Sequence, residues 1–125
     1  MTTYRANLPQ LSGGLFVTDG GIETSLIFQQ GFDLPYLAAF VLLATEDGQQ
    51  ALRRYFQAYG RLARAYRVGL ILESATWRAN PDWAEKIGYT PEALAEANRA
   101  AIRLLVGGID LSWDTLLPQL LATRS

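Results

Sequence analysis

An acid and two glycines stand where a short apolar run gives way to a helical pattern. Asp19, Gly20 and Gly21 follow the apolar run 15–18, and the residues after them are typical of a helix. The glycines allow a ligand to approach the backbone, and the first amides of the helix can bind an anion. The carboxylate of Asp19 can meet a cationic amine at the same place. Because an α-amino acid carries both groups, the motif predicts an amino-acid site, although Asp-Gly-Gly is also typical of a plain turn.

A second polar group follows the apolar run 68–72. Glu73 comes directly after this run, with Ser74, Thr76 and Trp77 close behind. Ligands collect at the carboxyl ends of parallel strands, so we expect Glu73 and its neighbours to share a site with Asp19. Two structural alternatives remain open: Glu73 can pair with an arginine, and Trp77 can be a packing aromatic.

The elements that would position these groups alternate between strand and helix. We expect strands at 15–18, 36–43 and 68–74, although two alanines leave 36–43 ambiguous between strand and helix. Helices are expected over 22–30, 49–66, 81–89 and 91–105, and the last three follow Thr45, Asn80 and Thr90 as N-caps. Strand alternating with helix predicts an α/β fold with a parallel sheet, either doubly wound or a barrel.

The helix over 49–66 has a clear amphipathic pattern. Its apolar stripe is expected to face the sheet, and its arginine-rich face is expected to be solvated. The stripe consists of Leu52, Tyr55, Phe56, Tyr59, Leu62, Ala63 and Tyr66.

Composition excludes several classes of function. The chain has 125 residues and a formal net charge of -1, which gives no electrostatic case for nucleic acid or an anionic membrane. It has no cysteine and no histidine, so disulfides, the usual zinc ligands and the common hydrolytic triads are excluded. We find neither an apolar run long enough to cross a membrane nor a signal-peptide pattern, and we therefore expect a cytoplasmic protein.

Three blocks of the sequence together resemble the opening of the homocysteine S-methyltransferase family, the homocysteine-binding domain. The blocks are LFVTDGGIETSLIFQQGFDLP, LRRYFQAYGRLARAYRVGLILESATWRANPDW and IGYTPEALAEANRAAIRLL. The resemblance implies an incomplete (β/α)8 TIM-type barrel of about three N-terminal βα units, because a whole barrel needs at least about 200 residues. It implies residues 1–105 as the N-terminal part of the homocysteine-binding domain and 106–125 as a divergent tail.

The resemblance also implies an activity and a set of site residues. The complete family transfers a methyl group from a methyl donor to the sulfur of homocysteine or a related thiol or selenol. Asp19 matches the acid that meets the substrate amino group, and Glu73 replaces a neutral residue, which suggests an altered acceptor. The substrate-binding residues carried over are Asp19, Gly20, Gly21, Thr24, Glu73, Thr76 and Trp77.

The zinc of the complete family is implied to be held by three cysteines, and this chain has none. We therefore expect no cofactor in this chain and no methyl transfer by the chain alone. The alternative is a non-catalytic partial-barrel protein that binds an amino acid or oligomerises. Because three parallel strands leave an open edge, we also expect self-association.

Overall fold

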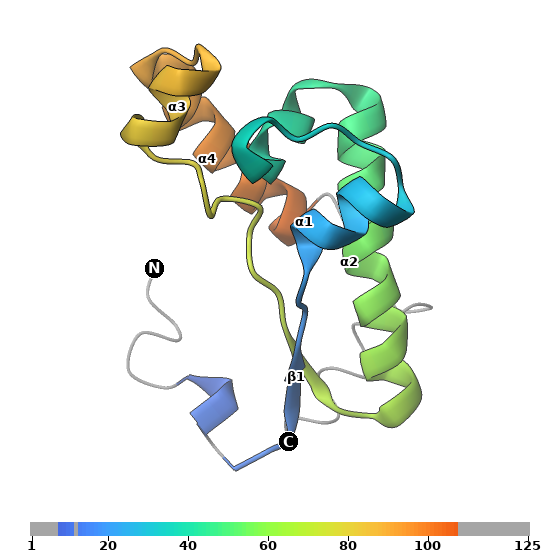
Figure 1. Cartoon of the computed structure of the whole chain (residues 1–125). Coiled ribbons are helices and arrows are strands. Elements are labelled where there is room, and N and C mark those ends of the chain that lie inside the picture. Colours follow the sequence, from blue (N-terminus) through green and yellow to red (C-terminus); the bar gives the residue numbers. More distant parts are fainter. Residues whose placement is uncertain (1–7, 12, 108–125) are drawn as a thin grey trace.

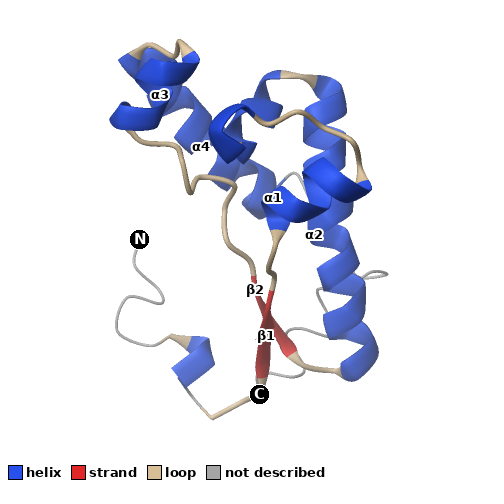
Figure 2. Cartoon of the chain, in the orientation of Figure 1, coloured by secondary structure: helices blue, strands red, loops and turns tan. Residues whose placement is uncertain are grey.

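The computed structural model describes residues 8–11 and 13–107, and within them the chain is mostly helical (Figures 1 and 2). Two short strands, β1 (Phe16–Thr18) and β2 (Gly69–Ile71), form one parallel pair. The longer helices are α2 (Glu46–Tyr66) and α4 (Pro91–Gly107), with α3 (Pro81–Ile87) between β2 and α4. After β1, the short helix α1 (Ile22–Thr24) continues as a π-helical turn over Ser25–Gln29. A 3₁₀ turn over Pro9–Leu11 precedes β1.

The expectation of an incomplete barrel built from three βα units is wrong for the described residues. The segment expected to form a second strand, 36–43, instead forms two 3₁₀ helices, η3 (Pro35–Leu37) and η4 (Ala39–Ala44). The strands on either side of it, β1 and β2, therefore pair directly, with Val17 opposite Leu70. In a barrel of three successive units the middle strand would separate them.

The segment that replaces the expected strand is a central part of the core. Ala39, Phe40, Leu42 and Leu43 of η4 are buried, and η4 packs against both α2 and α4. A run that is buried on all sides needs no alternation of polar and apolar residues, so its hydrophobicity does not distinguish strand from helix. Tyr36 and Leu37 have φ values of 53° and 59°, a left-handed backbone that interrupts any extended conformation.

The predicted helix N-termini are confirmed by their capping hydrogen bonds. The Thr45 hydroxyl accepts from the Gly48 N–H at 3.0 Å at the start of α2. Asn80 caps α3 in the same way, accepting from the Trp83 N–H at 3.3 Å. Thr90 caps α4 by accepting from the Ala93 N–H at 3.1 Å.

Most of the apolar stripe of α2 is buried, and two of its members near the C-terminal end of the helix are exposed. Leu52, Tyr55 and Phe56 belong to the core, whereas Leu62 is 48% exposed and Tyr66 is 73% exposed. The end of α2 runs beside the strands, whose small sheet offers less area than a full sheet would (Figure 1). Helix α4 extends past the expected boundary at residue 105 to Gly107, and the rest of the expected tail lies outside the described residues.

No helix in the described part of the chain is long and apolar enough to cross a membrane.

Candidate functional site

A pocket lies at the carboxyl ends of the two paired strands. It has a volume of about 580 Å³ and is open to solvent on one side. β1 leads into it through Asp19, and β2 leads into it through Glu73, because parallel strands end at the same edge. The residues that line it are Asp19, Gly20, Gly21, Ile22, Glu23, Glu73, Ser74, Thr76 and Trp77.

The carboxylate of Asp19 joins three elements at the edge of this pocket. Its Oδ1 accepts a hydrogen bond from the Glu73 N–H at 2.9 Å, which links the ends of β1 and β2. Its Oδ2 accepts a hydrogen bond from the Tyr55 hydroxyl of α2 at 3.0 Å. Asp19 is therefore held in one orientation from both sides, and each oxygen keeps a further lone pair for a ligand.

The backbone of Gly20 is held by two tyrosines of α2. The Tyr59 hydroxyl donates to the Gly20 carbonyl at 2.8 Å, and the Gly20 N–H approaches the same hydroxyl at 3.3 Å. The Tyr55 hydroxyl also lies 2.9 Å from the Gly20 carbonyl, so its proton is shared between that oxygen and Asp19. The Gly20 N–H is therefore already bonded within the protein.

Gly21 provides the turn from strand to helix. Its φ of 68° lies in the left-handed region, where a side chain is strained. The N–H groups of Gly21 and Ile22 stand at the beginning of α1, where amides lack intrahelical partners.

Tyr55 is a neutral hydrogen-bond donor to the acid at this site. Burial raises its pKa above the ordinary value, and the hydrogen bond to Asp19 and the charge of Asp19 raise it further. The side chain is only 5% exposed. Its hydroxyl thus remains protonated over the whole physiological pH range and orients the Asp19 carboxylate.

The pocket is acidic. Asp19, Glu23 and Glu73 line it, and the described residues that line it include neither an arginine nor a lysine. The hydroxyls of Ser74 and Thr76 are hydrogen-bonded to each other at 2.8 Å. Such a lining favours a ligand with a positive charge and hydrogen-bonding groups.

Six of the seven residues expected from the sequence line this one pocket: Asp19, Gly20, Gly21, Glu73, Thr76 and Trp77. The seventh, Thr24, is exposed on α1 and is not among the lining residues. Tyr55 and Tyr59 were expected only to fill the apolar stripe of α2. Their hydroxyls, one helical turn apart, were the available signal, since a buried tyrosine hydroxyl usually needs a partner.

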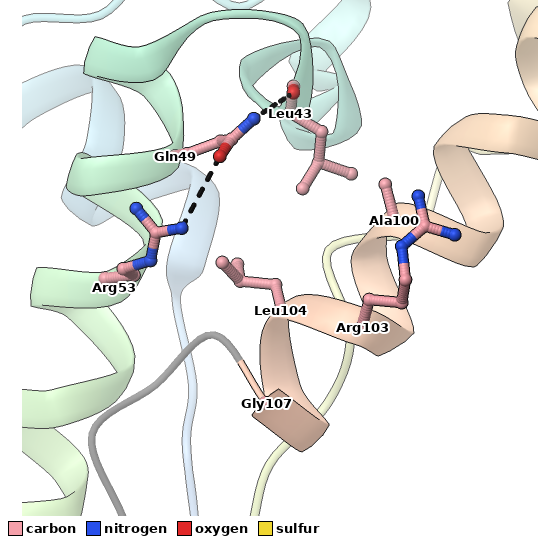
Figure 3. A pocket seen from close by; sticks show the side chains of 7 residues that line it. All are labelled: Leu43, Gln49, Arg53, Ala100, Arg103, Leu104 and Gly107. Carbon is pink, nitrogen blue, oxygen red and sulfur yellow. Dashed lines mark hydrogen bonds between the residues drawn. The ribbon is translucent and has the colours of Figure 1, made fainter.

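A second pocket, of about 400 Å³, lies between α2, η4 and the end of α4 near Gly107 (Figure 3). Gln49 donates from Nε2 to the Leu43 carbonyl at 2.9 Å and accepts from Arg53 at 3.5 Å. Arg103 forms an ion pair with Glu96. The polar side chains that line this second pocket thus bond to groups of the chain itself. The second pocket is therefore a weaker candidate for a ligand site than the acidic pocket.

Comparisons of the chain with protein-family models, with curated proteins and with solved structures find no match.

Proposed function

We propose that the acidic pocket binds the ammonium group of a free amino acid. The observation that carries this proposal is the lining itself, whose described residues include three carboxylates and no basic side chain. Asp19 and Glu73 would receive the ammonium group, because they lie at the adjoining ends of β1 and β2. The ligand carboxylate would meet the N–H groups of Gly21 and Ile22. A volume of about 580 Å³ is in the range of small-molecule pockets and accommodates an amino acid.

The three sequence blocks support homocysteine, or a related amino acid with a thiol or selenol, as the ligand. By that resemblance we propose that the chain is related to homocysteine S-methyltransferases, whose complete members transfer a methyl group to sulfur. The proposal concerns the ligand and the ancestry. It does not depend on a barrel.

Zinc, which the resemblance implies for the complete family, does not fit the residues of this chain. The sequence has no cysteine or histidine. Among the described residues, no cluster of three or more acidic side chains is arranged to hold a metal ion. Because a thiol is activated by a metal or a comparable device, we propose binding without methyl transfer for the chain alone. Elemental analysis that finds one tightly held zinc per chain would contradict this part.

Titration calorimetry with matched ligands tests the proposal. We expect L-homocysteine to bind, and 4-mercaptobutanoate, which lacks the amino group, to bind at least about tenfold more weakly, since a charged hydrogen bond is lost. Glu73→Gln should weaken the binding of L-homocysteine about three- to tenfold. Glu92 is an exposed acid on α4 outside the pocket, and Glu92→Gln should leave the binding unchanged. Equal affinities for the two ligands would contradict recognition of the amino group.

A further inference from the structure

One wall of the acidic pocket is an exposed indole ring that stacks on a guanidinium group. Trp77 lines the pocket and is 62% exposed. The guanidinium carbon of Arg78 lies 4.1 Å from the centroid of the Trp77 ring and 4.0 Å from that of the Trp83 ring. The guanidinium group therefore lies between an indole at the pocket and an indole in the first turn of α3.

The second indole of this stack is itself fixed on α3. The ammonium nitrogen of Lys86 lies 4.7 Å from the Trp83 ring centroid. The Tyr36 ring packs against Trp83 as well, with the ring centroids 5.5 Å apart. Trp83 is thus held by a second cation and a second aromatic ring, so the stack connects Trp77 to a well-supported helix.

Arg78 loses a hydrogen bond in this arrangement. Its Nε is buried and has no hydrogen-bond partner in the part of the chain that the structure describes. A buried donor without a partner is destabilising, and native structures contain few of them. Stacking on Trp77 and Trp83 is the favourable interaction that offsets this loss, and it holds Trp77 in place before any ligand arrives.

A surface that is fixed in advance favours binding, because less conformational entropy is lost when the ligand arrives. Trp77 lies four residues beyond Glu73, so the pocket has carboxylates at the strand ends and an indole on its wall. Within the described part of the chain, the pocket lining has one other large apolar side chain, that of Ile22. An amino acid with its ammonium group at Asp19 and Glu73 would present its side chain to these apolar surfaces.

We propose that Trp77 determines specificity for an amino acid with a long apolar side chain, and that Arg78 is the positioning residue that holds Trp77. This proposal rests on the proposed function and names the side-chain class that the same pocket selects. Removal of Trp77 or Arg78 should then affect ligands with long side chains and leave ligands with short ones nearly unchanged.

The test compares L-norleucine with L-alanine, which differ by three methylene groups, by titration calorimetry on the full chain. In the wild type we expect L-norleucine to bind about tenfold more tightly, as expected for methylenes that enter an apolar site. Trp77→Ala and Arg78→Ala should each reduce this ratio to about twofold or less, with a change of less than about threefold for L-alanine. Arg78→Lys should retain an intermediate ratio, since a lysine ammonium cannot stack as a guanidinium does but still makes a cation–π contact with an indole.

Trp83→Phe is the matched control. Residue 83 is not among the lining residues of the pocket, and phenylalanine still gives Arg78 an aromatic partner, so the ratio of L-norleucine to L-alanine affinity should be preserved. The stack has a readout that needs no ligand: ring currents should shift the Arg78 Hε resonance upfield in the wild type. If Arg78→Ala does not fold, the Arg78 Hε chemical shift and the affinity ratio of Arg78→Lys decide whether Arg78 positions Trp77. An unshifted resonance, or an unchanged ratio in Trp77→Ala, would overturn the proposal.

The outcomes also separate this proposal from the one on which it rests. Equal affinities of the wild type for L-alanine and L-norleucine would overturn the selectivity and leave amino-acid binding in place. If the wild type binds none of L-alanine, L-norleucine and L-homocysteine, both the selectivity and the amino-acid binding are overturned.

Discussion

The backbone N–H of Glu73 donates a hydrogen bond of 2.9 Å to Oδ1 of Asp19, across 54 residues of sequence. The other oxygen of Asp19 accepts from Tyr55. One carboxylate thus connects the ends of both strands with α2, and in the proposed function the same carboxylate receives the ligand. Stability and binding are therefore coupled at Asp19, and variants are needed that separate the two.

We expect Asp19→Asn to lower the free energy of unfolding by about 1–3 kcal/mol, because it removes hydrogen bonds to a charged group. Glu73→Gln should change it by less than about 0.5 kcal/mol, since Glu73 contributes its backbone N–H and its side chain is exposed. Urea denaturation of both variants checks this. If Glu73→Gln were as destabilising as Asp19→Asn, the connection between the strand ends would depend on the Glu73 side chain instead.

Tyr55 should remain protonated at a pH where exposed tyrosines ionise, because burial and then Asp19 raise its pKa. Absorbance at 295 nm at about pH 10.5 should therefore show the same number of ionised tyrosines in the folded wild type and in folded Tyr55→Phe. One more ionised tyrosine in the wild type than in the variant would contradict the raised pKa.

The same shift predicts a pH dependence of stability. Above about pH 10 the unfolded chain releases the Tyr55 proton while the folded chain keeps it, so stability falls as the pH rises. Below that pH the free energy of unfolding of the wild type minus that of Tyr55→Phe should be constant. Above it this difference should fall, because only the wild type has the Tyr55 proton to lose on unfolding. Urea denaturation at a series of pH values measures this difference, and a gain in wild-type stability relative to Tyr55→Phe above about pH 10 would contradict the raised pKa.

Gly48 marks the closest approach of α2 to η4. A Cβ built on it would lie 2.1 Å from the Leu42 carbonyl oxygen, which is backbone and cannot move aside alone. We expect Gly48→Ala to destabilise the protein by about 1–3 kcal/mol, although alanine favours a helix by about 1 kcal/mol. Gly107→Ala, with open space at its Cβ position, is the control for thermal unfolding. A higher melting temperature for Gly48→Ala would contradict the close packing.

We expect the full chain to self-associate as its concentration rises. The described sheet has only two strands of three residues, and large apolar side chains are exposed near it and elsewhere, among them Leu15, Phe28 and Val106. Open strand edges and exposed apolar side chains favour association. Size-exclusion chromatography with light scattering checks this, and a monomer at every concentration would show that these surfaces are tolerated.

The parts of the fold that were predictable are those with local signals. The positions of α2, α3 and α4 follow from Thr45, Asn80 and Thr90, whose side chains cap the helices in the structure as their types predict. The segment 36–43 carried no such signal. Its burial between α2 and α4 depends on packing far from it in sequence, and no local pattern distinguishes that from a buried strand.

The candidate site shows the same division. Asp19 and Glu73 were expected to lie together because each follows a strand, and they do, although the strand between them is absent. Tyr55 and Tyr59 were not expected there, since their contacts with Asp19 and Gly20 depend on where α2 crosses the strand ends.

The most direct test of the account is to map the amino-acid site by NMR. L-Homocysteine is titrated into ¹⁵N-labelled protein while backbone amide and indole resonances are followed. Binding at the strand ends predicts the largest shifts at Gly21, Glu73 and Thr76 and at the Trp77 indole, and these should shrink in Glu73→Gln. Shifts centred on the pocket near Gly107, or no shifts at millimolar ligand, would contradict the claim that the acidic pocket binds an amino acid.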